Sequence, residues 1–329
     1  MSHAVLVTGA FGNIGSRTVR HLLSQGHRVV AVDLQTPKTE AVAATFGDTI
    51  NILWGSICDR DIWATALEGI DTVVHMAAII PPLSERNPKL AVAVNQTATF
   101  DLVDHMQKSA TAKRLIFASS MTVAGHEQYL RAPPLSVDDQ LKPTDLYGKT
   151  KAECEDYIRA STLQWSILRI AACPPSEVSF SSDTYAIEII FESSPDGRIE
   201  VVHNDDAALA FANAVTCDAA IGKILFVGGG ERCRTLALDF YNRVFAAMGI
   251  GPLRPEVFRP GPPYFFGDWL DTAESQKLLA FQRHTIDDIC AELRSSAGFK
   301  RWLLKPIAPL VNRILERRSP YRTAAARSH

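Results

Sequence analysis

The chain opens with Val5-Leu6-Val7-Thr8-Gly9-Ala10-Phe11-Gly12-Asn13-Ile14-Gly15, and this stretch decides the fold. Its pattern predicts an apolar strand, a glycine-rich turn and the start of an amphipathic helix. In such a unit the glycines allow a tight turn and a close approach of the backbone to a pyrophosphate, which then sits at the helix N-terminus. The glycine spacing alone is a weak signal, because a plain turn before a helix gives the same pattern. Its place directly after a fully apolar strand favours a dinucleotide site.

An acidic residue, Asp33, ends the second expected strand and follows Gly15 by 18 residues. A carboxylate at this position accepts hydrogen bonds from the adenosine ribose hydroxyls and repels a 2′-phosphate. The alternative is an ordinary loop aspartate. After the glycine turn we favour the cofactor role, and therefore NAD over NADP, although the nearby Lys38 leaves some use of NADP open.

Short β-branched apolar runs alternate with longer amphipathic segments through the first half of the chain. We expect strands at residues 5–8, 28–32, 51–54, 72–75, 114–118 and 166–169, and helices at 14–24, 61–67, 92–107 and 146–160. This alternation is typical of a parallel sheet covered by helices on both faces. We therefore predict an α/β fold with a doubly wound parallel sheet (Rossmann-type) and a smaller C-terminal substrate lobe. The expected divisions are an NAD-binding domain at 1–170, a mainly substrate-binding lobe at 171–298 with elements returning to the sheet, and a basic amphipathic tail at 299–329.

The composition is that of a globular chain. Of the 329 residues 47% are hydrophobic, which excludes a disordered chain, and a formal net charge of −2 gives no support to a nucleic-acid-binding protein. The six cysteines form no Cys-x-x-Cys pair and the nine histidines no His-Glu-x-x-His pattern, so we expect no metal site. No apolar run reaches the roughly 18 residues of a membrane-spanning helix. We expect a soluble, cytoplasmic protein.

Tyr147 and Lys151 lie four residues apart at the start of an expected helix, on one helical face. A nearby ammonium favours the phenolate and so lowers the pKa of a tyrosine, which lets Tyr147 exchange a proton with a substrate hydroxyl near neutral pH. Ser119 and Ser120 follow an apolar strand, at the edge where an open α/β sheet binds ligands. Alone, a Tyr–Lys pair at this spacing is a frequent accident of helix surfaces, and a serine at a strand end can simply cap a helix.

Together these residues resemble the extended short-chain dehydrogenase/reductases, also called the NAD-dependent epimerase/dehydratase family. The resemblance rests on Thr-Gly-x-x-Gly-x-x-Gly at 8–15, Ser119-Ser120 and the Tyr147/Lys151 pair, with further matches at 74–78, Asn95, 168–169, 203–207 and 271–279. It covers about residues 3–290. It implies an NAD-dependent enzyme that transfers a hydride reversibly at an alcohol or ketone carbon.

The resemblance also implies roles for single residues. Val123-Ala124-Gly125 is similar to the family's Val-Tyr-Gly, and counting back three residues from Val123 places the catalytic hydroxyl at Ser120 rather than Ser119. Tyr147 is then the acid/base, and Lys151 is the partner that lowers its pKa and holds the nicotinamide ribose. Asn95 is expected to be structural. The implied cofactor-binding set is Gly9, Phe11, Gly12, Asn13, Ile14, Gly15, Asp33, Ser56, Ile57, Ala77, Ala78, Tyr147 and Lys151.

Four residues at three sites depart from the family's patterns. Ser56 stands where many relatives carry an aspartate that meets the adenine amino group, so adenine recognition is expected to rely on the backbone and Ile57. Met121-Thr122 follows Ser120 where dehydratases carry Asp-Glu, which disfavours dehydration. Ala172 stands three residues after Arg169, where sugar-nucleotide epimerases usually carry an asparagine that contacts the nucleotide phosphate.

Apolar residues occupy the corresponding places, at 79–82, 171–174 and 264–266 with Trp269. We therefore expect a secondary alcohol or ketone of a small or moderately apolar substrate, with Ile80, Ser120, Met121 and Cys173 as candidate contacts. A nearly equal alternative is that these residues only close the core between the two lobes. The alternative functions are an NAD-dependent sugar or sugar-nucleotide epimerase and a non-catalytic nucleotide-sensing regulator. The resemblance further implies a homodimer formed through helices beside the active site.

The last segment, from Lys300 to His329, has eight basic residues and one acidic residue. Its charge of +7 contrasts with −9 for the rest of the chain. Apolar residues alternate with the basic ones, so the segment has the pattern of a peripheral helix on an anionic membrane surface. Pro306 and Pro309 interrupt any long helix, and packing on the acidic body or on a dimer partner explains the pattern equally well.

Overall fold

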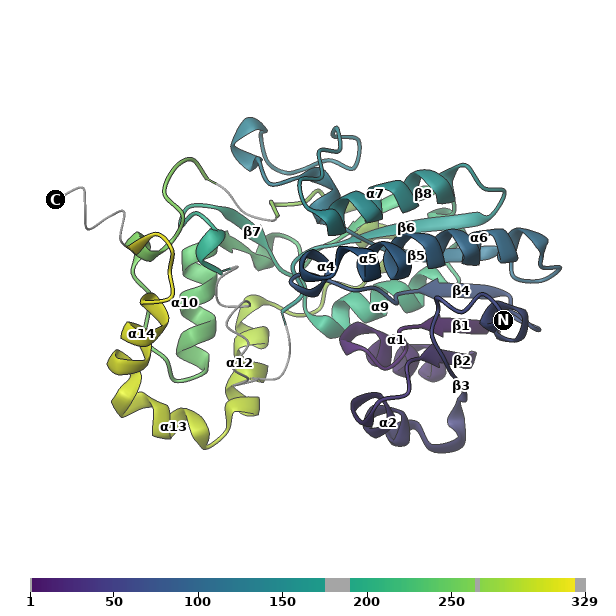
Figure 1. Ribbon diagram of the computed structural model, residues 1–329, viewed down its shortest axis with the longest axis horizontal. Coiled ribbons are helices and arrows are strands. Elements are labelled where there is room, and N and C mark those ends of the chain that lie inside the picture. Colours follow the sequence, from purple (N-terminus) through teal and green to yellow (C-terminus); the bar gives the residue numbers. More distant parts are fainter. Residues whose placement is uncertain (1, 175–189, 264–266, 323–329) are drawn as a thin grey trace.

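The computed structural model describes residues 2–174, 190–263 and 267–322 and consists of a sheet domain and a smaller C-terminal lobe (Figure 1). The aromatic run at 264–266, which we expected near the substrate, lies outside the described residues. Trp269, expected beside it, donates its indole N–H to the carbonyl oxygen of Thr235 and does not line the cavity described below.

Seven parallel strands form the main sheet, in the order β3-β2-β1-β4-β5-β6-β8. They are β1 (Ala4–Thr8), β2 (Arg28–Asp33), β3 (Asn51–Trp54), β4 (Thr72–His75), β5 (Arg114–Ser120), β6 (Gln164–Ile170) and β8 (Lys223–Val227). Every residue of β4 and β5 is buried, as is usual for parallel strands covered on both faces. The strand order reverses between β1 and β4, and a sheet of this kind binds ligands at that reversal. The predicted doubly wound sheet is confirmed.

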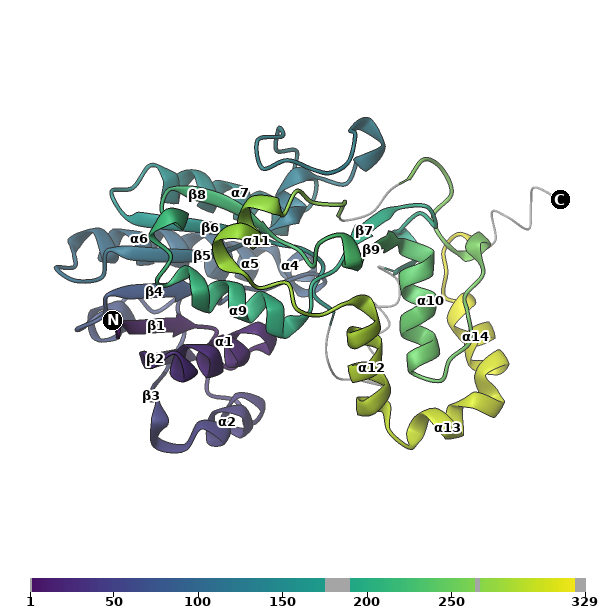
Figure 2. The ribbon, with the colours of Figure 1, turned by 180° about the vertical axis from the view of Figure 1, so that it is seen from behind.

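Helices cover both faces of the sheet, as the opposite views in Figures 1 and 2 show. Helices α1 (Asn13–Ser24), α9 (Asn204–Ala214) and α11 (Ala273–Leu279) share one apolar core with the sheet. On the other face α3 (Ile62–Ala66), α6 (Ala98–Lys108) and α7 (Leu146–Arg159) form a second core. Shorter helices lie in the connections: α2 (Pro37–Ala43), α4 (Leu83–Arg86), α5 (Pro88–Ala91) and a π-helical turn at Val92–Thr97.

The C-terminal lobe is built around a third apolar core. It contains the antiparallel pair β7 (Arg198–Glu200) and β9 (Arg234–Leu236), then α10 (Ala237–Ala247), α12 (Ile286–Ala297), α13 (Lys300–Leu304) and α14 (Ala308–Glu316). Strand β8 and helices α9 and α11 come from beyond residue 170 but pack on the sheet domain. Among the described residues, no helix is both long and apolar enough to cross a membrane.

Two elements differ from the sequence expectation for reasons visible in the structure. Strand β5 runs two residues further than expected, because Ser119 and Ser120 pair with Arg169 and Ile170 of β6. The helix expected at 92–107 begins as a π-helical turn, in which the buried Asn95 side chain bonds both the N–H and the carbonyl oxygen of Ile79. Asn95 thus holds the loop after β4, in keeping with the structural role expected for it.

A buried ion pair fixes α7 on the sheet. The guanidinium of Arg169 on β6 donates to Glu155 on α7, with Nη2 2.7 Å from Oε2 and Nε 3.0 Å from Oε1. The Ser119 hydroxyl donates to the same carboxylate at 2.5 Å. The side chains of Arg169 and Glu155 are 3% and 1% exposed, so neither charge is solvated by water. Helix α7 therefore has one register against β5 and β6.

Replacing Glu155 by alanine should destabilise the fold by about 3–5 kcal/mol, because Arg169 is left buried and unpaired. The matched control is Arg159→Ala on the same helix, whose pair with Asp156 is exposed (53% and 74%). That control should lose less than about 1 kcal/mol. Urea unfolding followed by circular dichroism measures both, and equal losses would contradict this account of α7.

Candidate active site

The turn between β1 and α1 needs glycine at two positions. Gly9 has a φ of +65°, and a Cβ there would lie 2.9 Å from the backbone nitrogen and Cα of Ala77. A Cβ on Gly15 would lie 2.1 Å from the carbonyl oxygen of Gly9. The first turn of α1 contains no acidic residue. Because a helix N-terminus favours anions, this cradle fits the pyrophosphate of a dinucleotide.

Asp33 at the end of β2 supports that turn. Its carboxylate accepts hydrogen bonds from the backbone N–H of Phe11 and of Leu34, both at 2.8 Å. Burial raises the pKa of Asp33, and these two hydrogen bonds oppose the rise. The carboxylate is half-buried, so it is still open to a further donor such as a ribose hydroxyl.

A cavity of about 390 Å³ opens at the carboxyl edge of the sheet, beside the glycine turn. The predicted site residues that line it are Gly9, Gly12, Asn13, Ile14, Gly15, Ala78, Ile80, Ser120, Tyr147, Lys151 and Cys173. Ser119 and Ala171, which the sequence also placed at this edge, line it too, and so do three residues that sequence reasoning missed: Met76, Ala118 and Ile170. Their position at or near the ends of β4, β5 and β6 could have identified them, because the carboxyl ends of parallel strands meet at the ligand-binding edge of the sheet.

Other predicted residues do not line the cavity: Phe11, Asp33, Ser56, Ile57, Ala77 and Met121. Phe11 packs beside Trp54, with ring centroids 5.3 Å apart, and Ile57 and Met121 are buried in the two sheet cores. The Ser56 hydroxyl accepts a hydrogen bond from the N–H of Cys58. Met121, an expected substrate contact, is buried in the core that α1, α9 and α11 share with the sheet, and its contact with substrate stays a prediction.

Ser120, Tyr147 and Lys151 lie together in this cavity. The Ser120 hydroxyl lines the same cavity as Tyr147 and accepts from the N–H and hydroxyl of Thr122, at 3.2 and 3.0 Å. The Lys151 ammonium donates to the carbonyl oxygen of Ala118 at 2.7 Å and lies 5.8 Å from the centroid of the Tyr147 ring. Since Ser119 is engaged by Glu155, Ser120 is the serine that meets Tyr147.

Burial dominates the electrostatics of the pair. It raises the pKa of Tyr147 above its ordinary value of 10.0, and the hydrogen bond with Ser120 opposes this only in part. Burial also lowers the pKa of Lys151 from 10.5 to about 8, against the opposing effects of Cys154 and Glu155. The Lys151 ammonium is turned toward the carbonyl oxygen of Ala118, and the lowering of the Tyr147 pKa by Lys151 stays a prediction.

The buried His75, at the end of β4, contacts β1 and α6. Its ring nitrogens lie 2.7 Å from the Thr8 hydroxyl and 3.0 Å from the Thr99 hydroxyl. Burial lowers the pKa of His75 to about 3, and Lys151 adds to this effect. A neutral histidine bonded on both sides holds β1, β4 and α6 together and is a structural group.

Cys173 and Asn13 join the glycine turn to the start of α9. Its thiol lies 2.7 Å from Oδ1 of Asn204 at the start of α9, and the Asn13 side chain donates to the same oxygen at 2.7 Å. Burial raises the pKa of Cys173 to about 12, so the thiol stays neutral. This contact holds the start of α9 directly against the turn.

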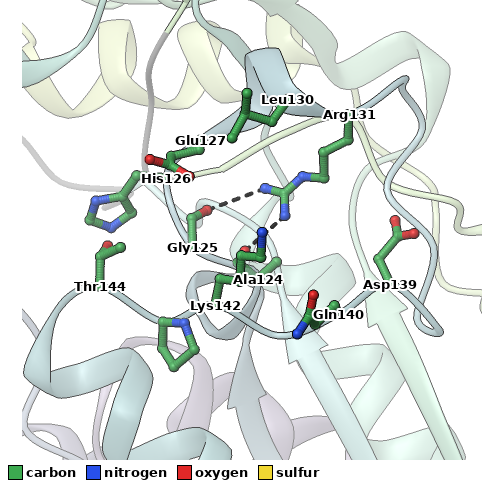
Figure 3. A pocket seen from close by; sticks show the side chains of 11 residues that line it. Ala124, Gly125, His126, Glu127, Leu130, Arg131, Asp139, Gln140, Lys142 and Thr144 are labelled. Atoms are coloured by element: carbon green, nitrogen blue, oxygen red, sulfur yellow. Dashed lines mark hydrogen bonds between the residues drawn. The ribbon is translucent and has the colours of Figure 1, made fainter.

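A second cavity, of about 480 Å³, lies next to the N-terminus of α7 (Figure 3). In it the Arg131 guanidinium donates to the carbonyl oxygens of Ala124 and Gly125. His126 lies 2.9 Å from Asp145, whose other carboxylate oxygen accepts from the N–H of Gly148 and so caps α7. His126 thus braces the start of the helix that carries Tyr147 and Lys151.

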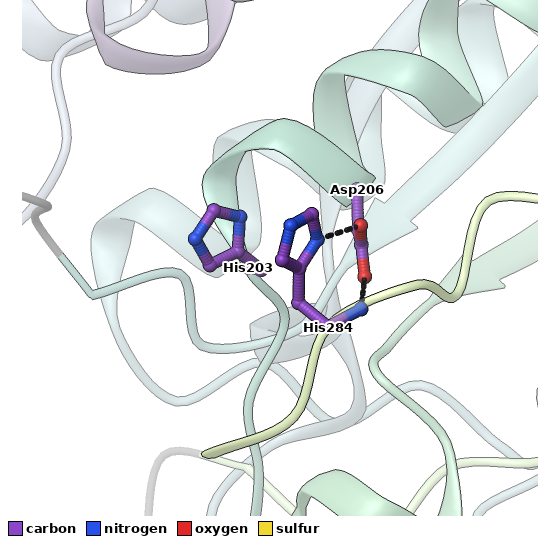
Figure 4. A group of neighbouring side chains, drawn as sticks. All are labelled: His203, Asp206 and His284. Carbon is purple, nitrogen blue, oxygen red and sulfur yellow. Dashed lines mark hydrogen bonds and ion pairs between the residues drawn. The ribbon is translucent and has the colours of Figure 1, made fainter. Parts of the chain in front are cut away.

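His203, Asp206 and His284 form a group of possible metal ligands, which sequence reasoning did not find because His284 is distant in the chain (Figure 4). Both carboxylate oxygens of Asp206 are already engaged: Oδ2 accepts from the N–H groups of Arg283 and His284, and Oδ1 lies 2.5 Å from Nδ1 of His284. His203 contacts Glu292 at 2.9 Å and stacks on His284. These contacts tie α9 to the start of α12, which is an architectural role.

The chain is similar to known proteins over most of its length. The model of the NAD dependent epimerase/dehydratase family matches residues 5–176. A 3β-hydroxysteroid dehydrogenase/Δ5→4-isomerase of Mycobacterium tuberculosis is 29% identical over 265 residues, which are 74% of this chain and 69% of that protein. A UDP-glucose 4-epimerase of Bacillus subtilis is 31% identical over half of each chain. Among solved structures, the fold is similar to that of a UDP-glucose 4-epimerase from Stenotrophomonas maltophila, which was crystallised with bound NAD and formylated UDP-arabinopyranose. The TM-score is 0.75 at 23% sequence identity, and the match covers 92% of this chain and 99% of that one.

The lowered pKa of Lys151 makes stability depend on pH. Between about pH 8 and pH 10.5 the unfolded chain holds the proton on this lysine and the folded chain releases it, so folded-state stability rises with pH across that window. We expect the unfolding free energy of the wild type, relative to Lys151→Met, to rise by up to about 3 kcal/mol over the window. Urea unfolding at a series of pH values measures this. Lys149→Met, at an exposed neighbour, should follow the wild type; parallel curves for wild type and Lys151→Met would refute the prediction.

Proposed function

Because the chain belongs to the NAD-dependent epimerase/dehydratase family, we propose that it transfers a hydride between NAD and the carbon of a secondary alcohol or ketone in a moderately apolar substrate. One observation carries the proposal: Ser120, Tyr147 and Lys151 share a cavity with the glycine turn. The presence of all three side chains favours an enzyme over a nucleotide-sensing regulator. The family is NAD-dependent, in agreement with the cofactor expected from the turn and from Asp33.

The residues of the cavity divide the reaction between them. NAD, when bound, supplies the carbon that accepts the hydride from an alcohol or returns it to a ketone. Tyr147 takes the hydroxyl proton as the C–H bond breaks, and gives it back in the reverse direction. Ser120 orients the reacting oxygen. Lys151 is placed to turn from Ala118 toward the nicotinamide ribose, and its charge then favours the Tyr147 phenolate that burial disfavours.

The walls of the cavity favour an apolar substrate over a sugar nucleotide. Ile80, Ile170, Ala171 and Met76 line it beside the reacting groups. Ala172 cannot make the phosphate contact that sugar-nucleotide epimerases usually make through an asparagine. The hydroxysteroid dehydrogenase matches a larger share of the chain than the Bacillus subtilis epimerase, 74% against half. We therefore place hydroxysteroid-like alcohols first, and sugar epimerisation second on the strength of the epimerase matches.

Assays with NAD separate these two substrates. A 3β-hydroxysteroid should be oxidised with net formation of NADH, whereas UDP-glucose should give neither NADH nor UDP-galactose.

Tyr147→Phe should lower turnover by at least about a hundredfold while NAD affinity changes little, because general acid–base catalysis contributes 10²–10⁴-fold. Interconversion of the UDP-sugars by the wild type, with no net NADH, would overturn the substrate assignment; full turnover by Tyr147→Phe would overturn the mechanism.

We further propose a homodimer through α6 and α7. Phe100 of α6 and Tyr157 of α7 are half-exposed and stack with ring centroids 4.1 Å apart, which gives the two helices a shared aromatic surface. Light scattering after gel filtration should give the mass of two chains. Tyr157→Glu should shift it to one chain, while Tyr129→Glu, at a 43% exposed tyrosine elsewhere, should leave the dimer intact. A wild-type monomer would contradict the proposal.

A further inference from the structure

Exposed apolar side chains gather on α13 and α14. Twelve large hydrophobic residues are well exposed in the described part of the chain, and half of them fall between residues 299 and 314. These six, which we call the tail face, are Phe299, Trp302, Leu303, Ile307, Leu310 and Ile314, with exposed fractions of 47–72%. They follow one another along α13, the short turn at Lys305–Ile307 and α14, and Leu310 and Ile314, four residues apart, share one side of α14. In Figure 1 both helices lie at the end of the molecule away from the sheet.

The opposite side of α14 is firmly packed on the lobe. Val311 and Leu315 pack against the lobe's apolar core, and the Asn312 side chain donates to the carbonyl oxygen of Pro252 at 2.8 Å. Glu316, the one acidic residue of the tail, is buried against Arg254, with Nη2 2.7 Å from Oε2. Packing on the protein's own body therefore uses the inner side only. The tail face stays exposed while the segment is folded.

Basic residues accompany the tail face. Lys305, Arg313, Arg317 and Arg318 are exposed along the same segment. The Arg301 guanidinium carbon and the Lys305 ammonium each lie 5.0 Å from the centroid of the Trp302 ring, so both cations contact the tryptophan. With Glu316 turned inward, the outward charge of the segment is positive.

We propose that the tail face docks on an anionic lipid bilayer, with α13 and α14 lying in the plane of the membrane interface. Apolar side chains between basic ones suit this position, because the apolar groups enter the acyl boundary while lysine and arginine meet lipid phosphates. Tryptophan favours the same depth. A second copy of the chain fits less well, since a symmetric contact would bring two positive surfaces together. Docking attaches the protein without a spanning helix.

Co-sedimentation of the full-length protein with vesicles tests the proposal. The protein should pellet with phosphatidylcholine vesicles that contain phosphatidylserine, much less with phosphatidylcholine alone, and less as salt is raised. Leu310→Ser should weaken partitioning on the order of tenfold, because one leucine no longer enters the lipid. Its matched control is Leu130→Ser, which removes a leucine of equal exposure (61% against 60%) from another surface.

Two double variants, each of which replaces two basic residues by glutamate, test the electrostatic part of the proposal. Arg301→Glu with Lys305→Glu should abolish most binding to phosphatidylserine vesicles, whereas Lys108→Glu with Lys113→Glu, at exposed lysines of the sheet domain, should not. Absence of wild-type binding at low salt would overturn the proposal, as would equal binding to neutral vesicles. A wild-type dimer that Leu310→Ser dissociates would also overturn it, because a second copy would then cover the tail face.

Discussion

The buried ion pair between Glu155 and Arg169 is the interaction on which the site depends. It joins α7 to β6, and Ser119 of β5 adds a third element to the same carboxylate. Tyr147, Lys151 and Glu155 are spaced by four residues, so they share one side of α7. Fixing Glu155 therefore also fixes Tyr147 and Lys151 in the cavity that Ser120 lines. A buried pair of this kind contributes little net stability but makes any other register costly.

That placement has an electrostatic consequence. Burial drives Tyr147 and Lys151 toward their neutral forms, because it raises the pKa of the tyrosine and lowers the pKa of the lysine. Tyr147 therefore keeps its proton near neutral pH while Lys151 bonds the carbonyl oxygen of Ala118. Reorientation of this ammonium toward a bound cofactor would couple occupancy of the site to its reactivity.

Much of the sheet domain could be predicted from local pattern. The six expected strands all form, and Ser120, Tyr147 and Lys151 meet in one cavity, because strand ends and four-residue helical spacing are properties of short segments. The rest depends on contacts between distant segments. No local pattern shows that Met121 turns into the core, that Asp33 holds the N–H of Phe11, or that His284 meets Asp206. In the tail the pattern indicated an amphipathic segment, but only packing shows which side is covered.

A crystal structure with NAD tests the central claim most directly. The account predicts the nicotinamide ribose within hydrogen-bonding distance of Lys151 and Tyr147, the adenosine ribose at Asp33, and an unchanged Glu155–Arg169 pair. A nicotinamide bound in the second cavity beside His126, or an α7 that shifts away from β6 when NAD binds, would contradict it.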